Sequence, residues 1–228
     1  MPPKAPVLSV RDLALHKGDA PYSFDVHPGL TLLETSRESG ATTLSLALAG
    51  RFSPADGTVA LGGPGGVSST RRRFASVALA GVPLIDTLER AVSAREAIRE
   101  QVAWAQPFFS RVPRDILGHQ LVEPWLAPLG LEGLDPARTV GELSNLDRMR
   151  LRVLLALVGR REAKLLIVDD PDQLRSHALR NELLLNLGDV SEHVPVLVTS
   201  VNPDPEVIAD EVIDLTAGRV HLREEVRA

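Results

Sequence analysis

The first third of the chain alternates apolar and polar positions in short runs that proline and glycine interrupt. Residues 6–15 and 22–33 carry β-branched and apolar side chains at near-alternation, and residues 57–61 form a shorter run. This period of two predicts β-strands joined by turns. Between the runs, residues 42–50 (TTLSLALAG) place leucines at helical spacing and end on Gly50, which predicts one helix with a glycine stop.

Residues 93–142 have a different pattern. Ser93 and Glu96 stand three residues apart before the segment AREAIREQVAWA, as in a capping box, and five prolines follow between positions 107 and 136. The spacing predicts a helix that begins after Ser93 and several short elements behind it. We therefore expect a helical insert.

The last third returns to an alternation of helical and apolar segments. We predict a helix at 144–159, a buried strand at 164–168, a helix near 174–187, a second buried strand at 194–199 and a closing pair of strands within 211–222. Buried strands that alternate with helices are typical of a mostly parallel sheet.

The composition excludes several classes of protein. With 44% hydrophobic residues, the 228-residue chain can bury a core without disulfide or metal staples. It has no cysteine, which excludes disulfides, thiolate zinc sites and cysteine nucleophiles. A formal net charge of -5 opposes nucleic-acid binding, and we expect the basic run Arg71–Arg73 to be a solvated loop or helix face. No apolar window reaches about 18–20 residues, so we expect no membrane span, and work at a membrane would need a partner.

The loop of residues 35–43 (TSRESGATT) lies between a predicted strand and a predicted helix, where phosphate-binding loops are found. Against the pattern G-x-x-x-x-G-K-[ST], it keeps the second glycine as Gly40 and the hydroxyl as Thr42. Thr35 replaces the first glycine, and Ala41 replaces the lysine. The motif alone therefore fails, and the threonines after Ala41 are equally consistent with a simple helix cap.

A longer segment, residues 142–173, supplies the context. The sequence LSNLD at 143–147 begins an arginine-rich helix that leads to the apolar strand 165–168 and then to DDP at 169–171. In these features the chain resembles the ATP-binding cassette (ABC) ATPases, whose signature loop LSGGQ begins a helix that leads into an apolar strand ending in Asp-Glu-Pro. Other segments agree in order, so the resemblance covers residues 6–222.

This resemblance implies a fold class. The chain would be an α/β, P-loop NTPase-like ABC cassette with an antiparallel β subdomain, a mostly parallel core sheet and a helical insert. Residues 1–228 would form a single cassette, and residues 93–142 would be the helical subdomain within it.

The resemblance also implies a set of site residues. Those expected to contact a nucleotide are Gly40, Ala41, Thr42, Thr43 and Ser144. Thr42 and Asp169 would hold Mg²⁺. Asp170 stands where the family has its catalytic glutamate, on a side chain one methylene shorter, which impairs the geometry for a base. The implied cofactors are ATP and Mg²⁺, bound weakly or not at all, because most motifs depart from the family pattern.

The phosphate loop and the signature both depart from that pattern. Ala41 removes the lysine charge that reaches the β- and γ-phosphates in the family, and Glu38 adds a carboxylate that would repel phosphate unless it turns away. In the signature, Asn145 and Leu146 replace both glycines, so a backbone approach to phosphate becomes harder. Ser144 survives, but it also matches an ordinary Ser-x-x-Asp helix cap.

Three further positions depart from the family. The switch histidine falls on Ser200 or Val201. The adenine-stacking aromatic falls on His16 or Lys17, with Tyr22 several residues late. No glutamine stands near position 80, where the family has its Q-loop.

We therefore predict a catalytically degenerate nucleotide-binding-domain protein, a pseudo-ATPase that serves as a structural or regulatory subunit of a membrane transport or cell-envelope complex. The lysine, the glutamate and the histidine are lost together, and each such group is worth a factor of about 10² to 10⁴ in rate. The alternative is an ATP-binding, slowly hydrolysing subunit of an ABC transporter. A soluble role in DNA or translation chemistry is disfavoured, because such proteins usually carry tandem cassettes or long coiled coils.

The expected partners are a membrane permease-type subunit and, in a homodimer or a heterodimer, a second ABC cassette, with no nucleic acid. The chain would be cytoplasmic and peripheral at the inner face of the membrane through its partner. The resemblance places the partner surface near residues 80–130, where four aromatic residues would form a groove or, for at least two of them, pack in the core of the insert. These residues are Trp104, Phe108, Phe109 and Trp125.

Overall fold

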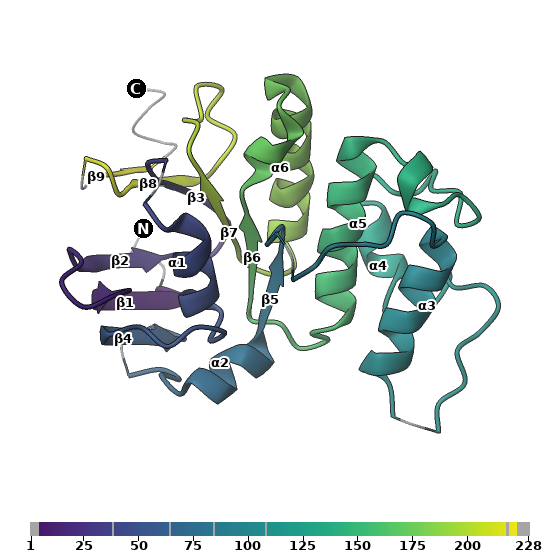
Figure 1. The fold of residues 1–228 in the computed structure, drawn as a ribbon, viewed down its shortest axis with the longest axis horizontal. Coiled ribbons are helices and arrows are strands. Elements are labelled where there is room, and N and C mark those ends of the chain that lie inside the picture. Colours follow the sequence, from purple (N-terminus) through teal and green to yellow (C-terminus); the bar gives the residue numbers. More distant parts are fainter. Residues whose placement is uncertain are drawn as a thin grey trace.

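The computed structural model describes residues 5–37, 39–63, 65–83, 85–107, 109–217 and 219–222. The chain forms a three-stranded sheet and a six-stranded sheet, with helices on both faces of the larger one (Figure 1). Two residues named in the sequence predictions, Glu38 and Phe108, lie outside the described residues.

The smaller sheet has the strand order β2-β1-β4. β1 spans Leu8–Ala14, β2 spans Tyr22–Val26 and β4 spans Asp56–Leu61, and both outer strands run antiparallel to β1. Val59 and Leu61, two positions apart on β4, are buried while their neighbours are not, as an alternating strand requires.

The larger sheet has the strand order β5-β6-β7-β3-β8-β9. Its strands are β5 (Val77–Ala80), β6 (Leu165–Asp169), β7 (Val196–Ser200), β3 (Leu30–Glu34), β8 (Glu211–Asp214) and β9 (Arg219–Leu222). The first five are parallel, and β9 runs antiparallel to β8. Every residue of β6 and β7 is buried, which explains why these strands are continuous apolar runs rather than alternating ones.

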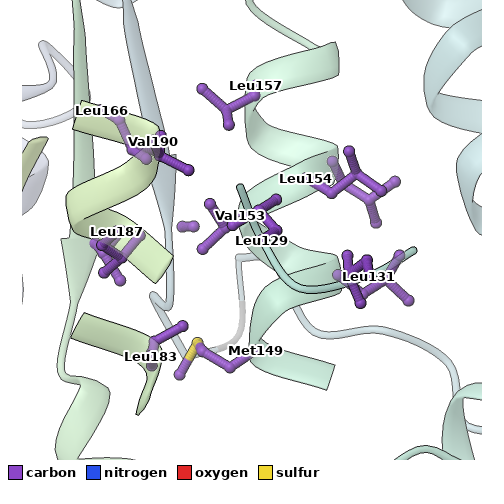
Figure 2. Close-up of a cluster of buried hydrophobic side chains, with 14 of the residues drawn as sticks. Leu129, Leu131, Met149, Val153, Leu154, Leu157, Leu166, Leu183, Leu187 and Val190 are labelled. Atoms are coloured by element: carbon purple, nitrogen blue, oxygen red, sulfur yellow. The ribbon is translucent and has the colours of Figure 1, made fainter. Parts of the chain in front are cut away.

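Helices cover both faces of this sheet. They are α1 (Ala41–Leu48), α2 (Thr70–Ser76), α3 (Ala94–Ala105), α4 (Glu123–Leu126), α5 (Asn145–Val158) and α6 (His177–Ser191), with the short 3₁₀ helices η1 (Val140–Glu142) and η2 (Pro171–Leu174). Leu166 of β6 packs in the cluster that contains α5 and α6, whereas Leu165 packs on the opposite face with α1. Figure 2 shows Met149 of α5 facing Leu183 of α6 within the first cluster.

The predicted fold class is confirmed, including the antiparallel sheet, the mostly parallel core sheet and the order of strands and helices in the first and last thirds. The predicted capping box is also present. Ser93 Oγ accepts a hydrogen bond from the Glu96 amide at 3.2 Å, and Glu96 Oε2 accepts one from the Ser93 amide at 2.9 Å, at the start of α3.

Two elements of the structure, α2 and β5, were not predicted. The basic run Arg71–Arg73, expected to be solvated, lies in α2, and the expectation is wrong for Arg73. Arg71 and Arg72 are exposed, but Arg73 is only 3% exposed. Its guanidinium donates to the carbonyl oxygens of Val59 at 3.0 Å and Ala47 at 3.4 Å. A buried arginine is tolerated here because backbone carbonyls at the ends of other elements accept its donors.

The region predicted as a helical insert contributes α3 and α4, which lie beside α5 on the side away from the three-stranded sheet (Figure 1). Its boundaries, 93–142, stay a prediction. Among the described helices, none is both long enough and apolar enough to cross a membrane.

Candidate functional site

The first turn of α1 borders a cleft at the carboxyl ends of the parallel strands. Gly40 caps the helix with φ 72° and ψ 27°, a left-handed conformation that glycine adopts at little cost, and no side chain caps the helix. The Thr42 hydroxyl instead donates to Asp169 Oδ2 at 2.7 Å. The sequence left two explanations open for these threonines, a phosphate loop or a simple helix cap. Because no threonine side chain caps α1, the geometry does not support the cap.

The cleft has a volume of about 420 Å³. It is lined by Thr35, Ser36, Arg37, Gly40, Ala41, Thr42, Thr43, Asp170, Thr199, Ser200 and Val201. Three of the predicted residues of the phosphate loop therefore line it together with Gly40. Arg37 is the only basic residue among the described residues that line it, and it is exposed. The site thus has helix-terminal amides but lacks the buried lysine of the family.

Asp169 ends β6 and is fully buried. Its Oδ2 atom accepts the hydrogen bond from Thr42, and its Oδ1 atom accepts hydrogen bonds from Ser45 at 2.7 Å and from Thr199 at 2.8 Å. Ser45 lies in α1 and Thr199 in β7, so the carboxylate joins a helix to two strands. Each of the two oxygens already has a protein donor.

Asp170, the residue at the position of the catalytic glutamate, faces the cleft in an unusual conformation. Its φ of 49° and ψ of 66° are left-handed, and its amide donates to the Thr199 carbonyl at 3.1 Å. Burial raises the pKa of its carboxyl, and the negative charges of Asp172 and Asp169 raise it further. The structure therefore brings Asp170 to the cleft, as predicted, in a setting that disfavours its charged form.

Ser200, one of the two candidates for the position of the switch histidine, has its hydroxyl in a buried polar network. Its Oγ is 2.9 Å from Asp172 Oδ2 and accepts from Arg180 Nη2 at 3.0 Å. Arg180 and Asp172 form an ion pair at 3.0 Å with side chains only 2% and 9% exposed. The Val201 amide also donates to Asp172 at 2.9 Å, so this network fixes the loop that follows β7.

The residues at the signature belong to the start of α5. Ser144 Oγ accepts from the Asp147 amide at 3.0 Å and donates to Asp147 Oδ2 at 2.7 Å, so Ser144 is a helix cap. Leu146, which replaces a signature glycine, is 4% exposed and packs in the larger core cluster. Ser144 is exposed and is not among the residues that line the cleft.

At the predicted adenine position, the His16 ring meets Phe52 edge to face with a centroid separation of 5.8 Å. Lys17 is exposed. The Tyr22 hydroxyl donates to the Ser39 carbonyl at 3.4 Å and so contacts the phosphate loop itself.

Sequence reasoning missed several residues that shape the site. Ser45 was detectable, because it is the only polar side chain within the apolar run LSLALA. Asp172 and Arg180 carried no such signal, since their pairing depends on tertiary contacts. Gln173 of η2 was also missed. Its side-chain amide donates to the Gly81 carbonyl at 2.8 Å, next to position 80, where the family has its Q-loop and this sequence has no glutamine.

A second concavity of about 430 Å³ lies between the core and the insert. Its lining includes Arg51, Ile85, Asp86, Trp104, Arg152 and Arg160, and we call it the insert groove. Trp104 is 80% exposed and Ile85 is 53% exposed. Of the predicted aromatic set, Phe109 is also exposed at 95%, whereas Trp125 packs partly buried against the core.

The charges of the insert groove are poorly compensated. The guanidinium groups of Arg51 and Arg160 both lie over the Phe74 ring, at 5.3 and 4.6 Å from its centroid. Burial, together with the charge of Arg160, lowers the pKa of Arg51. Within the described part of the chain, buried atoms that lack a hydrogen-bond partner include Arg51 Nε, Arg152 Nε and Asp86 Oδ1.

Comparison with known proteins rests on structure. No protein-family model matches the sequence, and no curated protein is significantly similar to it. The cbiO1 protein of Clostridium perfringens, part of the ABC transporter complex cbiONQ, superposes with a TM-score of 0.73 at 19% identity, covering 98% of this chain and 91% of that one.

Two further structures agree. An ATP-binding cassette of an ABC transporter gives a TM-score of 0.76 at 16% identity, over 98% of this chain and 94% of that one. An ABC transporter ATP-binding protein from Pyrococcus furiosus gives 0.69 at 17% identity, over 92% and 98%. The chain therefore has the fold of an ABC ATP-binding cassette along nearly its whole length.

Proposed function

We propose that this chain is a pseudo-ATPase: an ABC-type cassette that serves as a structural or regulatory subunit of a membrane transport or cell-envelope complex. It is cytoplasmic and peripheral at the inner face of the membrane, held there by a permease-type subunit and able to pair with a second cassette. The likeness in fold to ATP-binding subunits of ABC transporters supports the general kind, and the chemistry of the cleft supports the loss of hydrolysis.

One observation carries the proposal. The cleft has an alanine at the start of α1 where the family has its phosphate-binding lysine, and Asp169 has protein donors on both carboxylate oxygens. The residues that would hold Mg²⁺–ATP are Gly40, Thr42, Thr43 and Asp169, and they fit that group poorly, because the lysine charge that offsets the phosphates is missing. Asp170 is one methylene shorter than glutamate, so its carboxylate is poorly placed to orient a water.

The insert groove supports the partner in this proposal. An exposed tryptophan and an exposed isoleucine that line one concavity together with arginines are features of a surface that another protein covers. Aromatic residues and arginine are also the commonest residues of interface hot spots.

The loss of hydrolysis is tested by calorimetric titration with Mg²⁺–ATP and by phosphate release. We expect no phosphate release above the blank from the natural chain. Ala41→Lys is the comparison, and we expect it to gain nucleotide affinity without turnover, because Asp170 and Ser200 remain. Micromolar ATP binding by the natural chain, with phosphate release that Asp169→Ala abolishes, would sink the proposal.

That outcome would instead support the second candidate, a slowly hydrolysing ABC transporter subunit. Arg37 is the observation in its favour, since it lines the cleft beside the α1 amides and carries a positive charge. Arg37→Gln therefore belongs in the same titration, where a loss of ATP affinity would assign the charge to nucleotide binding.

The membrane partner is tested by photo-crosslinking in cells, followed by gentle detergent extraction. A crosslinking residue in place of Trp104 should capture a membrane protein, whereas the same residue in place of the exposed Thr58 on β4 should not. Capture of soluble proteins alone at position 104 would count against the proposal.

A further inference from the structure

Asp169 is bonded to Thr42 of the cleft lining, and in the described part of the chain it has no charged partner. Its residue is 0% exposed. Among the described residues, no arginine, lysine or histidine forms an ion pair with it. A buried carboxylate without a cation is unfavourable unless several donors compensate its charge.

Three hydroxyl groups provide that compensation, and we call them the hydroxyl cage: Thr42 and Ser45 of α1, and Thr199 of β7. Their distances to the carboxylate oxygens, 2.7, 2.7 and 2.8 Å, are those of well-formed O–H···O hydrogen bonds. Ser45 Oγ also lies 3.2 Å from Thr199 Oγ1, so the two hydroxyls that serve Oδ1 contact each other.

Ser45 is the member that the sequence pattern does not explain. It is 0% exposed in a helix whose other buried residues are leucine and alanine. A serine at such a position costs helix propensity and core packing, and burial of its hydroxyl is unfavourable unless the hydroxyl is bonded. Its compensation is the hydrogen bond to Asp169, with the contact to Thr199 beside it.

We propose that the hydroxyl cage takes the place of a cation at Asp169, with Ser45 as the positioning residue, and that it fastens α1 to β6 and β7 without metal or nucleotide. In this arrangement the phosphate-loop helix is held in one position at all times. The stability of the cleft would then be a property of this chain, whatever partner binds it.

The test is thermal unfolding of the natural chain, Ser45→Ala and Thr43→Ala, each in EDTA and in Mg²⁺ without nucleotide. Thr43 is the matched control, because it is a neighbouring hydroxyl residue of α1 outside the cage, and alanine improves helix propensity at both positions. We expect Ser45→Ala to lower the melting temperature by about 4–8 °C relative to Thr43→Ala. The natural chain should melt within about 1 °C in EDTA and in Mg²⁺.

Equal melting temperatures for Ser45→Ala and Thr43→Ala would overturn the proposal. So would a rise of several degrees on adding Mg²⁺ to the natural chain. Thr199→Ser and Thr199→Val give an independent comparison, since the first keeps the hydroxyl and should match the natural chain while the second should be less stable.

If the variants do not fold, hydrogen exchange of the natural chain decides the question. The amides of residues 41–48 should exchange at the same slow rate in EDTA and in Mg²⁺. Fast exchange in EDTA that Mg²⁺ slows would show that the cage does not replace the cation.

Discussion

The phosphate-loop cleft and the insert groove are similar in volume but differ in which of their polar groups are satisfied. In the cleft, Asp169 and Ser200 are bonded within the chain. In the insert groove, Arg51 and Arg152 keep unpaired buried nitrogens, and Trp104 is 80% exposed.

The difference indicates where this cassette interacts with other molecules. A site that receives phosphates needs positive charge, and in the cleft this comes from the α1 amides and from Arg37, without a lysine at position 41. A surface built to be covered leaves donors and apolar area open until a partner arrives. The insert groove has these features.

The largest expected effect concerns the network that fixes the loop after β7. Arg180→Met should lower the free energy of unfolding by about 3–5 kcal/mol, because it leaves Asp172 as a buried charge without its partner. Arg51→Met in the insert groove should change it by less than about 1 kcal/mol, since burial and Arg160 already oppose its charge. Urea denaturation measures both. Equal losses would remove the contrast between the two regions.

The next effect is on the partner. Trp104→Ala should reduce recovery of the crosslinked or co-purified membrane subunit by about tenfold or more, because truncated aromatic anchors at interfaces have effects of this size. The matched control is Leu185→Ala, which removes an exposed apolar side chain from α6, outside the insert groove. Similar recovery from both variants would show that the groove is not the docking surface.

A smaller effect separates the signature position from the cleft. Ser144→Ala should cost about 1 kcal/mol of stability through the lost cap of α5, and Ser144→Asp should retain most of it. Neither variant should alter nucleotide titration of the monomer. A change in ATP affinity with unchanged stability would show that Ser144 contributes to nucleotide binding.

The smallest effect is a pH dependence within the insert groove. Burial raises the pKa of Asp86, while the charge of Arg152 opposes the rise. The folded state therefore keeps this proton to higher pH than the unfolded chain, so stability is lost as pH rises from the ordinary aspartate range through the raised pKa. Asp86→Asn should flatten this decline, because asparagine does not titrate, while its side-chain oxygen can still accept from the Gly81 amide. Urea midpoints between about pH 4 and 7 measure the slope, and identical slopes would contradict the assignment.

The sequence indicated the strands of the sheet and the position of the cleft. Particular segments explain why. β6 and β7 are apolar at every position because both faces are covered, and such runs are recognisable without tertiary information. The loop before α1 was marked by its place between a predicted strand and a predicted helix, and Asp169 by the resemblance to the ABC ATPases. In contrast, β5 is only four residues long and follows an arginine-rich helix, so its pattern is too short to indicate a strand.

The contacts that decide the chemistry could not be predicted in the same way. Ser45 meets Asp169 across 124 positions of sequence, and Arg180 meets the loop after β7 through a fold that brings α6 beside it. Arg73 was expected in solvent because a basic run is usually solvated, yet carbonyl oxygens of β4 and α1 accept its donors. In each case tertiary packing determines the hydrogen-bond partner, and such a contact produces no periodic pattern in the sequence.

The burial of Leu146 has a consequence for engineering and for evolution. A glycine at this position would restore one of the two signature glycines, but it would remove a core side chain and leave a cavity that costs about 2–5 kcal/mol. Lysine at position 41 faces no such obstacle, because Ala41 lines an open cleft. A change toward the family pattern is therefore costly to stability at position 146 and less so at position 41, so Leu146→Gly would need compensating changes in the packing around α5.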